Sequence, residues 1–236
     1  MTCVILQPSY IPWRGYFHQI YKADVFVFYD DVQYDVDGWR NRNRIKTHQG
    51  PSWLTIPVNS RGASATHIPI SSIRICWDRK WNESHFRSVQ QSYSRAPYFK
   101  RYEPLLADFF RARPEFLADF TVDTTIRLAA ELGIRNTRFL RSSQLQCAGS
   151  KTDRVLSVLR QVGATHYVSG PAAKAYLEVD KLEAAGIGVE WMDYSYPEYP
   201  QLHPPFDPYV SILDLLLMEG PQSGNYIWGA AGVPES

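Results

Sequence analysis

The first thirty residues contain a strand, a helix and a second strand. Residues 2–7 form a short apolar strand that stops at Pro8, and a short helix is expected from about Tyr16 to Ala23. Residues 25–29 are an unbroken apolar run of strand length, which suits a strand buried on both faces of a parallel sheet. A strand, a crossover helix and a parallel strand make a right-handed βαβ unit. This unit restricts the chain to the α/β class.

The second half of the chain repeats this alternation. Strands are expected at 136–143, 165–170 and 189–194, and helices at 151–163 and 178–186. About four parallel strands with helical crossovers make an open sheet with helices on both faces. We therefore predict a doubly wound, mostly parallel, Rossmann-like α/β sheet.

The middle of the chain departs from this pattern. Residues 45–58 are predicted to form a β-hairpin with a turn at Gln-Gly-Pro, and residues 61–67 a loop. Residues 68–77 alternate like an edge strand. From Arg79 to Gly133 the pattern is helical.

Prolines divide the helical region and suggest the domain organisation. Pro97 and Pro114 separate three expected helices. A terminal helix over 209–220 should end at Gly220, after a proline-rich loop. The predicted organisation is an α/β core domain formed by two segments, with a helical insertion between them: 1–78 and 134–236 for the core, and 79–133 for the insertion.

Composition limits the functional classes. The 236 residues, 44% of them hydrophobic, can bury a sizeable core. With 25 basic and 24 acidic residues, no global field attracts nucleic acid or an anionic membrane, although a local basic patch stays open. Three widely spaced cysteines argue against a disulfide framework and a zinc site. Neither a signal peptide nor a membrane-length apolar run is present, so we expect a cytoplasmic protein with no membrane partner.

Ligands of open α/β sheets bind beyond the carboxyl ends of the strands. This rule selects the four segments that follow the expected strands: Gln7–Gly15, Asp30–Lys46, Ser142–Arg154 and Ser169–Lys174. Polar side chains in these segments are the candidate site residues.

Three residues are candidate catalytic groups. Asp30 and Asp31 at a strand end suit a general base or a metal pair, or one caps the next turn while the other is solvated. His18 in the first helix and His203 in the proline-rich loop are the histidines expected to face a cleft, although a structural role suits each. No histidine array has metal-ligand spacing, so no metal site is predicted.

A basic cluster follows the second strand. On a strand its four cations would share one face: Arg40, Arg42, Arg44 and Lys46. They alternate with Asn41 and Asn43, and Trp39 and Trp53 flank them rather than acidic residues. Such a face suits bidentate binding of a phosphate or carboxylate. The alternative is a solvated edge strand protected by charge.

Two later segments resemble anion sites at helix starts. Gly149 and Lys151 precede a helix that Ser150 or Thr152 would cap, and simple capping accounts for this pattern equally well. A second turn presents several polar groups: Ser169, Gly170, Lys174 and Tyr176. Ser169 does not lie in a nucleophile elbow.

Aromatic residues form 14% of the chain and are expected mostly to fill the core, although such rings also line ligand pockets. The candidate binding residues are Gln7, Tyr10, Trp13, Gly15, Gln33, Asn41, Arg42, Asn43, Lys46, Lys151, Ser169, Gly170, Tyr176 and His203.

Several stretches together closely resemble the WbqC-like protein family. They cover nearly the whole chain and are residues 6–46, 50–58, 93–102, 151–177 and 196–220. The first sixty residues are the most specific part. The family occurs in gene clusters for surface polysaccharides and other specialised metabolites. The resemblance therefore implies a role in small-molecule biosynthesis.

A second, weaker resemblance concerns residues 7–18. This strand, turn and helix looks like the nucleotide-binding opening of the nucleotidyltransferase and pantothenate synthetase superfamily, which carries His-x-Gly-His. Here the tetrapeptide is Trp13, Arg14, Gly15 and Tyr16, so both histidines are absent. The resemblance implies the fold and a close backbone approach at Gly15 rather than adenylyl transfer.

Three functional hypotheses follow. The first is a transferase of an acyl, aminoacyl or nucleotidyl group to a small acceptor, with His18 or Asp30 as base; its anionic donor would be held by Arg42, Asn43, Lys46 and Lys151. The second is a non-catalytic nucleotide or sugar-nucleotide binding protein. The third is an aminoacyl-tRNA-dependent transferase that binds tRNA through the basic cluster. A nucleotide with Mg²⁺ would suit the first two.

Overall fold

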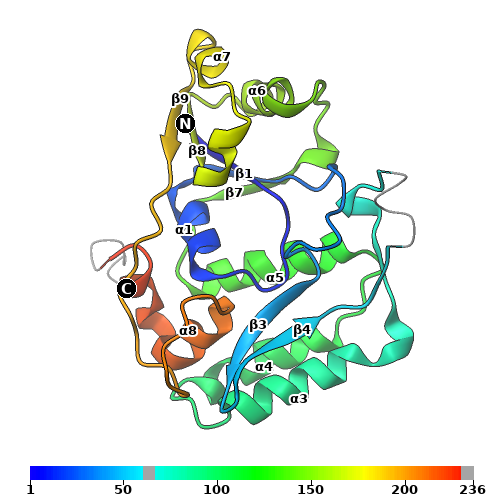
Figure 1. Ribbon diagram of the computed structural model, residues 1–236, viewed down its shortest axis with the longest axis vertical. Helices are drawn as coiled ribbons and strands as arrows, with labels where there is room; N and C mark the ends of the chain where they lie inside the picture. Colours follow the sequence, from blue (N-terminus) through cyan, green and yellow to red (C-terminus); the bar gives the residue numbers. More distant parts are fainter. Residues whose placement is uncertain (61–66, 230–236) are drawn as a thin grey trace.

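A five-stranded parallel β-sheet forms the centre of the computed structural model, which describes residues 1–60 and 67–229 (Figure 1). The sheet order is β7-β2-β1-β8-β9. These strands are β1 (Thr2–Leu6), β2 (Val25–Phe28), β7 (Arg138–Arg141), β8 (His166–Ser169) and β9 (Gly188–Trp191). The predicted doubly wound α/β fold is confirmed, with five strands where about four were expected. The loop expected at 61–67 lies, except for His67, outside the described residues.

Helices cover both faces of this sheet. α6 (Lys151–Val162) and α7 (Val179–Ala184) pack with Cys3 and Ile5 on one face. On the other face, α1 (Arg14–Lys22) and α5 (Leu117–Glu131) pack with Val4, because successive strand side chains point to opposite faces (Figure 1). All four residues of β2 are buried, which confirms that this apolar run is covered on both sides.

The strand order creates a crevice next to β1. From β1 the chain continues to β2 and β7 on one side, and later to β8 and β9 on the other. The connections that leave β1 and β8 therefore diverge at the carboxyl edge of the sheet. In sheets of this kind ligands bind at such a switch point.

The middle of the chain contains a hairpin and three helices. The hairpin consists of β3 (Arg42–Thr47) and β4 (Gly50–Thr55), with Thr47 paired to Gly50 across the turn. The edge strand expected at 68–77 is reduced to β6 (Arg74–Ile75) beside β5 (Val58–Asn59), because Pro69 and a 3-10 turn interrupt it. The predicted hairpin is thus confirmed, with its turn at His48 and Gln49 rather than at Gln-Gly-Pro, and the long edge strand is wrong.

The expected helical region has three helices, as predicted. α3 (Trp81–Tyr93), α4 (Phe99–Arg111) and α5 are separated at Pro97 and Pro114. Their apolar faces join the core that underlies the sheet. Short 3-10 helices complete the connections at 70–72, 77–79, 142–144, 171–175 and 220–226. The division into a core and an insertion remains a prediction.

The segment between β9 and α8 (Ile212–Glu219) lies along the molecule as an irregular strap (Figure 1). The buried carboxylate of Asp214 accepts hydrogen bonds from the Tyr93 and Tyr199 hydroxyls, each at 2.8 Å. Arg44 on β3 donates through Nε and Nη2 to the Tyr209 carbonyl at 3.1 and 2.7 Å. These bonds hold the strap, and Tyr209 with it, against the hairpin. α8 ends at Gly220 as predicted, with φ of 55°.

Within residues 1–60 and 67–229, no helix combines the length and the apolar composition needed to cross a bilayer.

We expect Asp214→Asn to change the pH dependence of stability. Burial raises the pKa of Asp214 above its ordinary value of 3.8. The carboxyl of the native protein therefore keeps its proton to higher pH than the carboxyl of the unfolded chain. As a result, the free energy of unfolding of wild type falls as the pH rises from 3.8 towards the raised pKa. The free energy of unfolding of the variant, relative to wild type, should increase over this acidic range. Urea unfolding at several pH values measures it, and a difference that shrinks with pH would contradict this origin.

Candidate binding cleft

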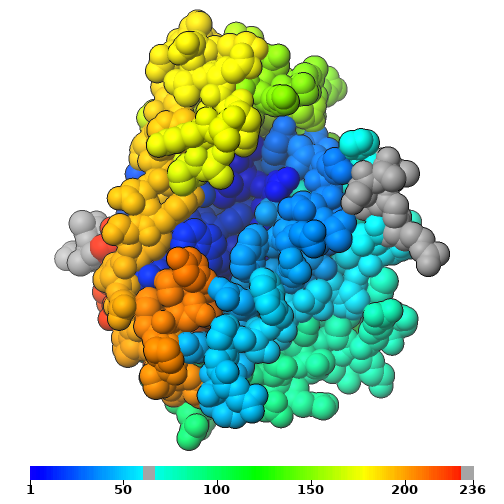
Figure 2. All heavy atoms as spheres, viewed as in Figure 1, coloured from blue at the N-terminus to red at the C-terminus, as the bar shows by residue number. Residues whose placement is uncertain are grey.

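A cavity of about 650 Å³ opens at the carboxyl edge of the sheet, beside β1. Its walls come from the end of β1, the start of α1, the segment between β2 and β3, the turn after β8 and the strap. Figure 2 shows it as a hollow between the first residues of the chain, the turn near residue 175 and the strap. The cleft thus occupies the switch point that the topology defines.

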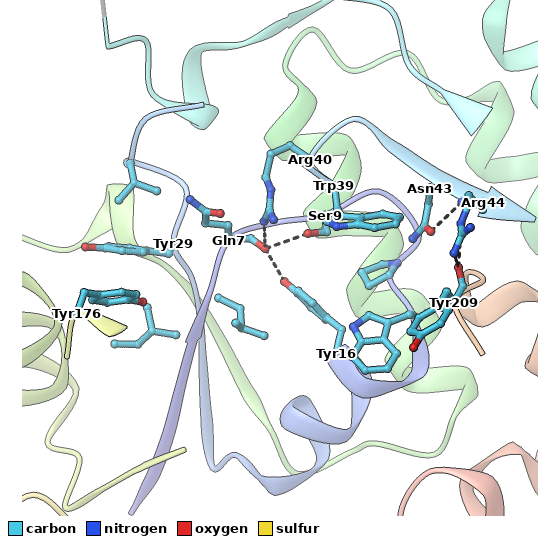
Figure 3. Close-up of a pocket in the computed structure, with 15 residues that line it drawn as sticks. Gln7, Ser9, Tyr16, Tyr29, Trp39, Arg40, Asn43, Arg44, Tyr176 and Tyr209 are labelled. Atoms are coloured by element: carbon cyan, nitrogen blue, oxygen red, sulfur yellow. Dashed lines mark hydrogen bonds between the residues drawn. The ribbon is translucent and has the colours of Figure 1, made fainter. Parts of the chain in front are cut away.

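The backbone carbonyl of Gln7 is the centre of the hydrogen bonding in the cleft (Figure 3). It accepts from Arg40 Nη1 at 3.1 Å, from the Tyr16 hydroxyl at 3.1 Å and from Ser9 Oγ at 3.4 Å. Arg40 Nη1 also lies 3.4 Å from the Pro8 carbonyl. One strand end therefore anchors side chains from α1 and from the segment before β3.

Arg40 brings a positive charge to the cleft without a matching carboxylate. In the described part of the chain it forms no ion pair, and its buried Nε has no hydrogen-bond partner. Burial lowers the Arg40 pKa, while Tyr16 and Asp35 oppose this effect. A guanidinium stays charged even so. Its Nη groups suit the oxygens of a phosphate or carboxylate in the cleft.

The groups that line the cleft can donate protons in hydrogen bonds but are poor bases. Its lining, as far as the structure describes the chain, has no His, Cys, Asp or Glu. Burial raises the pKa of Tyr29 to about 12, and also raises those of Tyr16 and Tyr176. These phenols are therefore protonated at neutral pH. The cleft can bind, orient and stabilise negative charge.

Exposed aromatic rings surround the mouth of the cleft. Trp39 is 44% exposed, Tyr176 53% and Tyr209 66%. The Trp53 ring lies 5.3 Å from that of Trp39, and the Arg42 guanidinium lies 5.1 Å from the Trp53 ring centre. Large exposed rings beside a cavity are typical of ligand sites rather than of core filling.

Four of the predicted binding residues line the cleft: Gln7, Trp13, Asn43 and Tyr176. Asn43 Nδ2 donates to the carbonyls of Tyr10 and Ile11, at 3.1 and 2.8 Å. It therefore holds the loop after β1 against β3. The aromatic ring of Trp13 makes edge contacts with Tyr194 and Tyr196, which fixes this wall.

The prediction that all four cations of the basic cluster share one strand face is wrong for Arg40, whereas Arg42, Arg44 and Lys46 alternate along β3 as predicted. β3 begins at Arg42, and Arg40 lies before it and reaches Gln7. Arg42 donates to the Asp37 carbonyl, and the ammonium of the buried Lys46 donates to the Pro205 carbonyl. Only Arg40 and Arg44 of the four line the cleft.

Asp30 and Asp31, the predicted catalytic pair, form a clamp between β2, β7 and α6. The fully buried Asp30 accepts from Arg141 Nε at 2.6 Å and from the Ser143 backbone N–H at 2.9 Å. Asp31 accepts from Ser142 Oγ at 2.6 Å and pairs with Arg154. Neither lines the cleft. Their hydrogen bonds give them a structural role.

His18, the third predicted catalytic residue, also lies outside the cleft lining. Its Nδ1 is 2.9 Å from the Tyr196 hydroxyl, beneath the strap. Burial, with a smaller contribution from Lys22, lowers its pKa. Gly15 packs under Trp13, where an added Cβ would lie 2.4 Å from the indole. The close approach that Gly15 permits is therefore to this ring.

The other predicted residues are distributed over the molecule. Tyr10 is in the core, 2.9 Å from His85 Nδ1, and Asn41 donates to the Ile56 carbonyl. Gln33 contacts His67 at 2.8 Å, and His203 contacts the Ser92 carbonyl at 3.0 Å. Lys151 is exposed at the start of α6, and the buried Ser169 donates to Tyr167. Gly170 turns the chain beside Tyr194.

Sequence reasoning did not select five residues with polar or aromatic side chains that line the cleft: Ser9, Tyr16, Tyr29, Trp39 and Tyr209. Tyr29 directly follows β2, so the strand-end rule could have identified it. Tyr209 has no such signal, because its position depends on the bonds between the strap and β3.

The chain was also compared with known proteins. The sequence model of the WbqC-like protein family matches residues 7–226. The uncharacterized protein Rv1507c of Mycobacterium tuberculosis (strain ATCC 25618 / H37Rv) is 38% identical over 225 residues, which cover 94% of this chain and 96% of that protein. No solved structure matches.

We expect Asp30→Asn to destabilise the protein by about 2–4 kcal/mol, because it leaves Arg141 without its buried carboxylate. Asp123→Asn is the matched control, since its exposed pair with Arg127 should contribute no more than about 0.5 kcal/mol. Urea unfolding measures both variants. Equal stability of Asp30→Asn and wild type would mean that the clamp is not structural.

Proposed function

This chain belongs to the WbqC-like protein family, and we propose that it is a biosynthetic group transferase that binds an anionic donor in the cleft. The transferred group would be an acyl, aminoacyl or nucleotidyl group, and the acceptor a small molecule. The occurrence of the family in biosynthetic gene clusters supports the broad role. The cleft supports the donor site.

One observation carries the proposal, which is the position of Arg40. Its guanidinium is anchored by the Gln7 carbonyl, lacks a carboxylate partner in the described chain, and borders an open cavity of about 650 Å³. A desolvated cation without an acidic partner is costly unless an anion completes it. The arrangement therefore favours a ligand that supplies the negative charge.

The cleft would act mainly through position and electrostatics. When a bond to a phosphate or carboxylate breaks, negative charge grows on the leaving oxygen. Arg40 and the protonated phenol of Tyr29 are the donors available to stabilise it, because the Tyr16 hydroxyl already donates to the Gln7 carbonyl. An unprotonated amine acceptor attacks without a base and then loses a proton to water, which agrees with a lining that, among the described residues, has no His, Cys, Asp or Glu.

A non-catalytic binding protein is the second candidate. The observation that favours it is the same lack of acidic, histidine and cysteine side chains in the described lining. Binding would then occur as in the first proposal, without turnover. Product analysis of a bound donor with amine acceptors separates the two.

Arg40→Met should weaken binding of sugar phosphates and other small anions by about 10-fold to 100-fold, because it removes charge-assisted hydrogen bonds. Arg40→Lys should restore part of the affinity, since it keeps the charge but loses the planar donor array. Isothermal titration calorimetry with a panel of phosphates and carboxylates measures this effect.

The matched control is Arg87→Met, which removes an exposed charge on α3 outside the cleft. It should leave affinity within about 2-fold, since a distant exposed charge is screened by salt. Equal losses for Arg40→Met and Arg87→Met would refute a specific anion site at Arg40. Thermal unfolding of each variant excludes a loss caused by misfolding.

A further inference from the structure

Two tyrosines occupy one end of the cleft, apart from its other aromatic residues. Figure 3 shows Tyr29 and Tyr176 together at one end, Gln7 and Arg40 in the middle, and Tyr209 at the opposite end. All five line the same cavity. The cleft therefore has an aromatic end, a cationic middle and a second aromatic end.

The backbone of both tyrosines is held firmly. Tyr29 follows β2, and its N–H donates to the Leu6 carbonyl of β1 at 2.7 Å. Tyr176 closes the 3-10 helix after β8, and its carbonyl accepts from Thr152 Oγ1 at 3.3 Å. Thr152 is fully buried and also accepts from the Glu178 N–H at 3.0 Å. The two rings thus come from the strands on either side of β1.

The core does not account for the Tyr176 ring. It is 53% exposed, whereas the rest of its helical turn is anchored by the buried Ala173 and Leu177. The apolar side chains of Ile5 and Leu6 line the same cavity, so this region offers ring faces and apolar contact. The hydroxyls of both tyrosines are protonated at neutral pH, because burial raises their pKa values.

We propose that this end of the cleft receives the base of a nucleotide whose phosphate lies at Arg40. The inference rests on the proposed function in that Arg40 holds the anionic part of the donor. A planar base stacks on phenol rings, and its carbonyl or ring nitrogen atoms accept hydrogen bonds from phenol hydroxyls. A ligand that joins a planar ring to an anion matches the order of groups along the cleft. The volume of the cavity is in the range of small-molecule sites.

The transferable group would then extend to the second aromatic end. Trp39 and Tyr209 lie on this side of Arg40 in Figure 3, and Arg44 of the hairpin donates to the Tyr209 carbonyl of the strap. A nucleotide linked through phosphate to a sugar or an acyl group has this sequence of parts. The donor class assigned to the site is therefore a nucleotide conjugate.

The test compares four probes by calorimetry: uridine monophosphate, adenosine monophosphate, ribose phosphate and uridine. Wild type should bind one of the two nucleotides at least about 5-fold more tightly than ribose phosphate, as base stacking on an aromatic ring predicts. Tyr176→Leu should abolish this advantage without weakening ribose phosphate, and Tyr176→Phe should keep most of it. Tyr21→Leu removes an exposed ring outside the cleft and should leave the advantage unchanged.

The outcomes separate the two proposals. If ribose phosphate binds as tightly as both nucleotides, and only Arg40→Met weakens it, the base site is wrong and the anion site stands. If Tyr176→Leu weakens the binding of uridine while Arg40→Met does not weaken the binding of any phosphate probe, the proposed anion site is wrong and the ring site stands. Absence of binding by all four probes overturns both. Because Tyr176 is exposed, Tyr176→Leu should fold normally, which thermal unfolding checks.

Discussion

The hydrogen bonds to the Gln7 carbonyl are the interaction on which the cleft depends. This oxygen lies where β1 ends, and the guanidinium of Arg40 and the hydroxyl of Tyr16 both donate to it at 3.1 Å. Neutral backbone acceptors hold the cation in place without cancelling its charge. An acidic partner would have held Arg40 as firmly but would have left no charge for a ligand.

Elsewhere in the molecule, charged groups are used to hold elements together. Asp30 pairs with Arg141 at the end of β7, and Asp31 pairs with Arg154 on α6. Asp214 accepts from Tyr199 of the strap and from Tyr93 of α3. A buried carboxylate with several donors is satisfied and is a poor base for an incoming substrate. Arg40 and Arg44, by contrast, line the cleft and form no ion pair within the described part of the chain.

The fold was largely predictable because periodicity is a local property. The apolar runs of β1 and β2, the hairpin at β3 and β4, and the prolines between the helices all follow from neighbouring residues. The edge strand at 68–77 was wrong because the alternating pattern was followed across Pro69, which lacks the N–H that a ladder requires. All five sheet strands overlap segments that the sequence pattern predicts as strands, although the predicted count was about four.

The candidate site was predictable only in part. The strand-end rule led to Gln7 and Asn43, which line the cleft, but also to Asp30, which does not. The rule locates an edge of the sheet and does not show which side chain points into a cavity. The same limit applies to the basic cluster, where strand alternation grouped Lys46 with Arg40 although one is buried under the strap and the other reaches Gln7.

The sequence by itself determined the α/β class, the parallel strands, the family and the edge of the sheet at which polar groups collect. These depend on residues near one another in the chain, whose pattern of apolar and polar side chains is visible directly. The tertiary structure decided that Arg40 rather than Lys46 lines the cleft, that Asp30 is bound by Arg141, and that Tyr29, Tyr176 and Tyr209 share one cavity. Those facts depend on contacts between residues more than a hundred positions apart, such as Arg44 with Tyr209, and only folding brings such residues together.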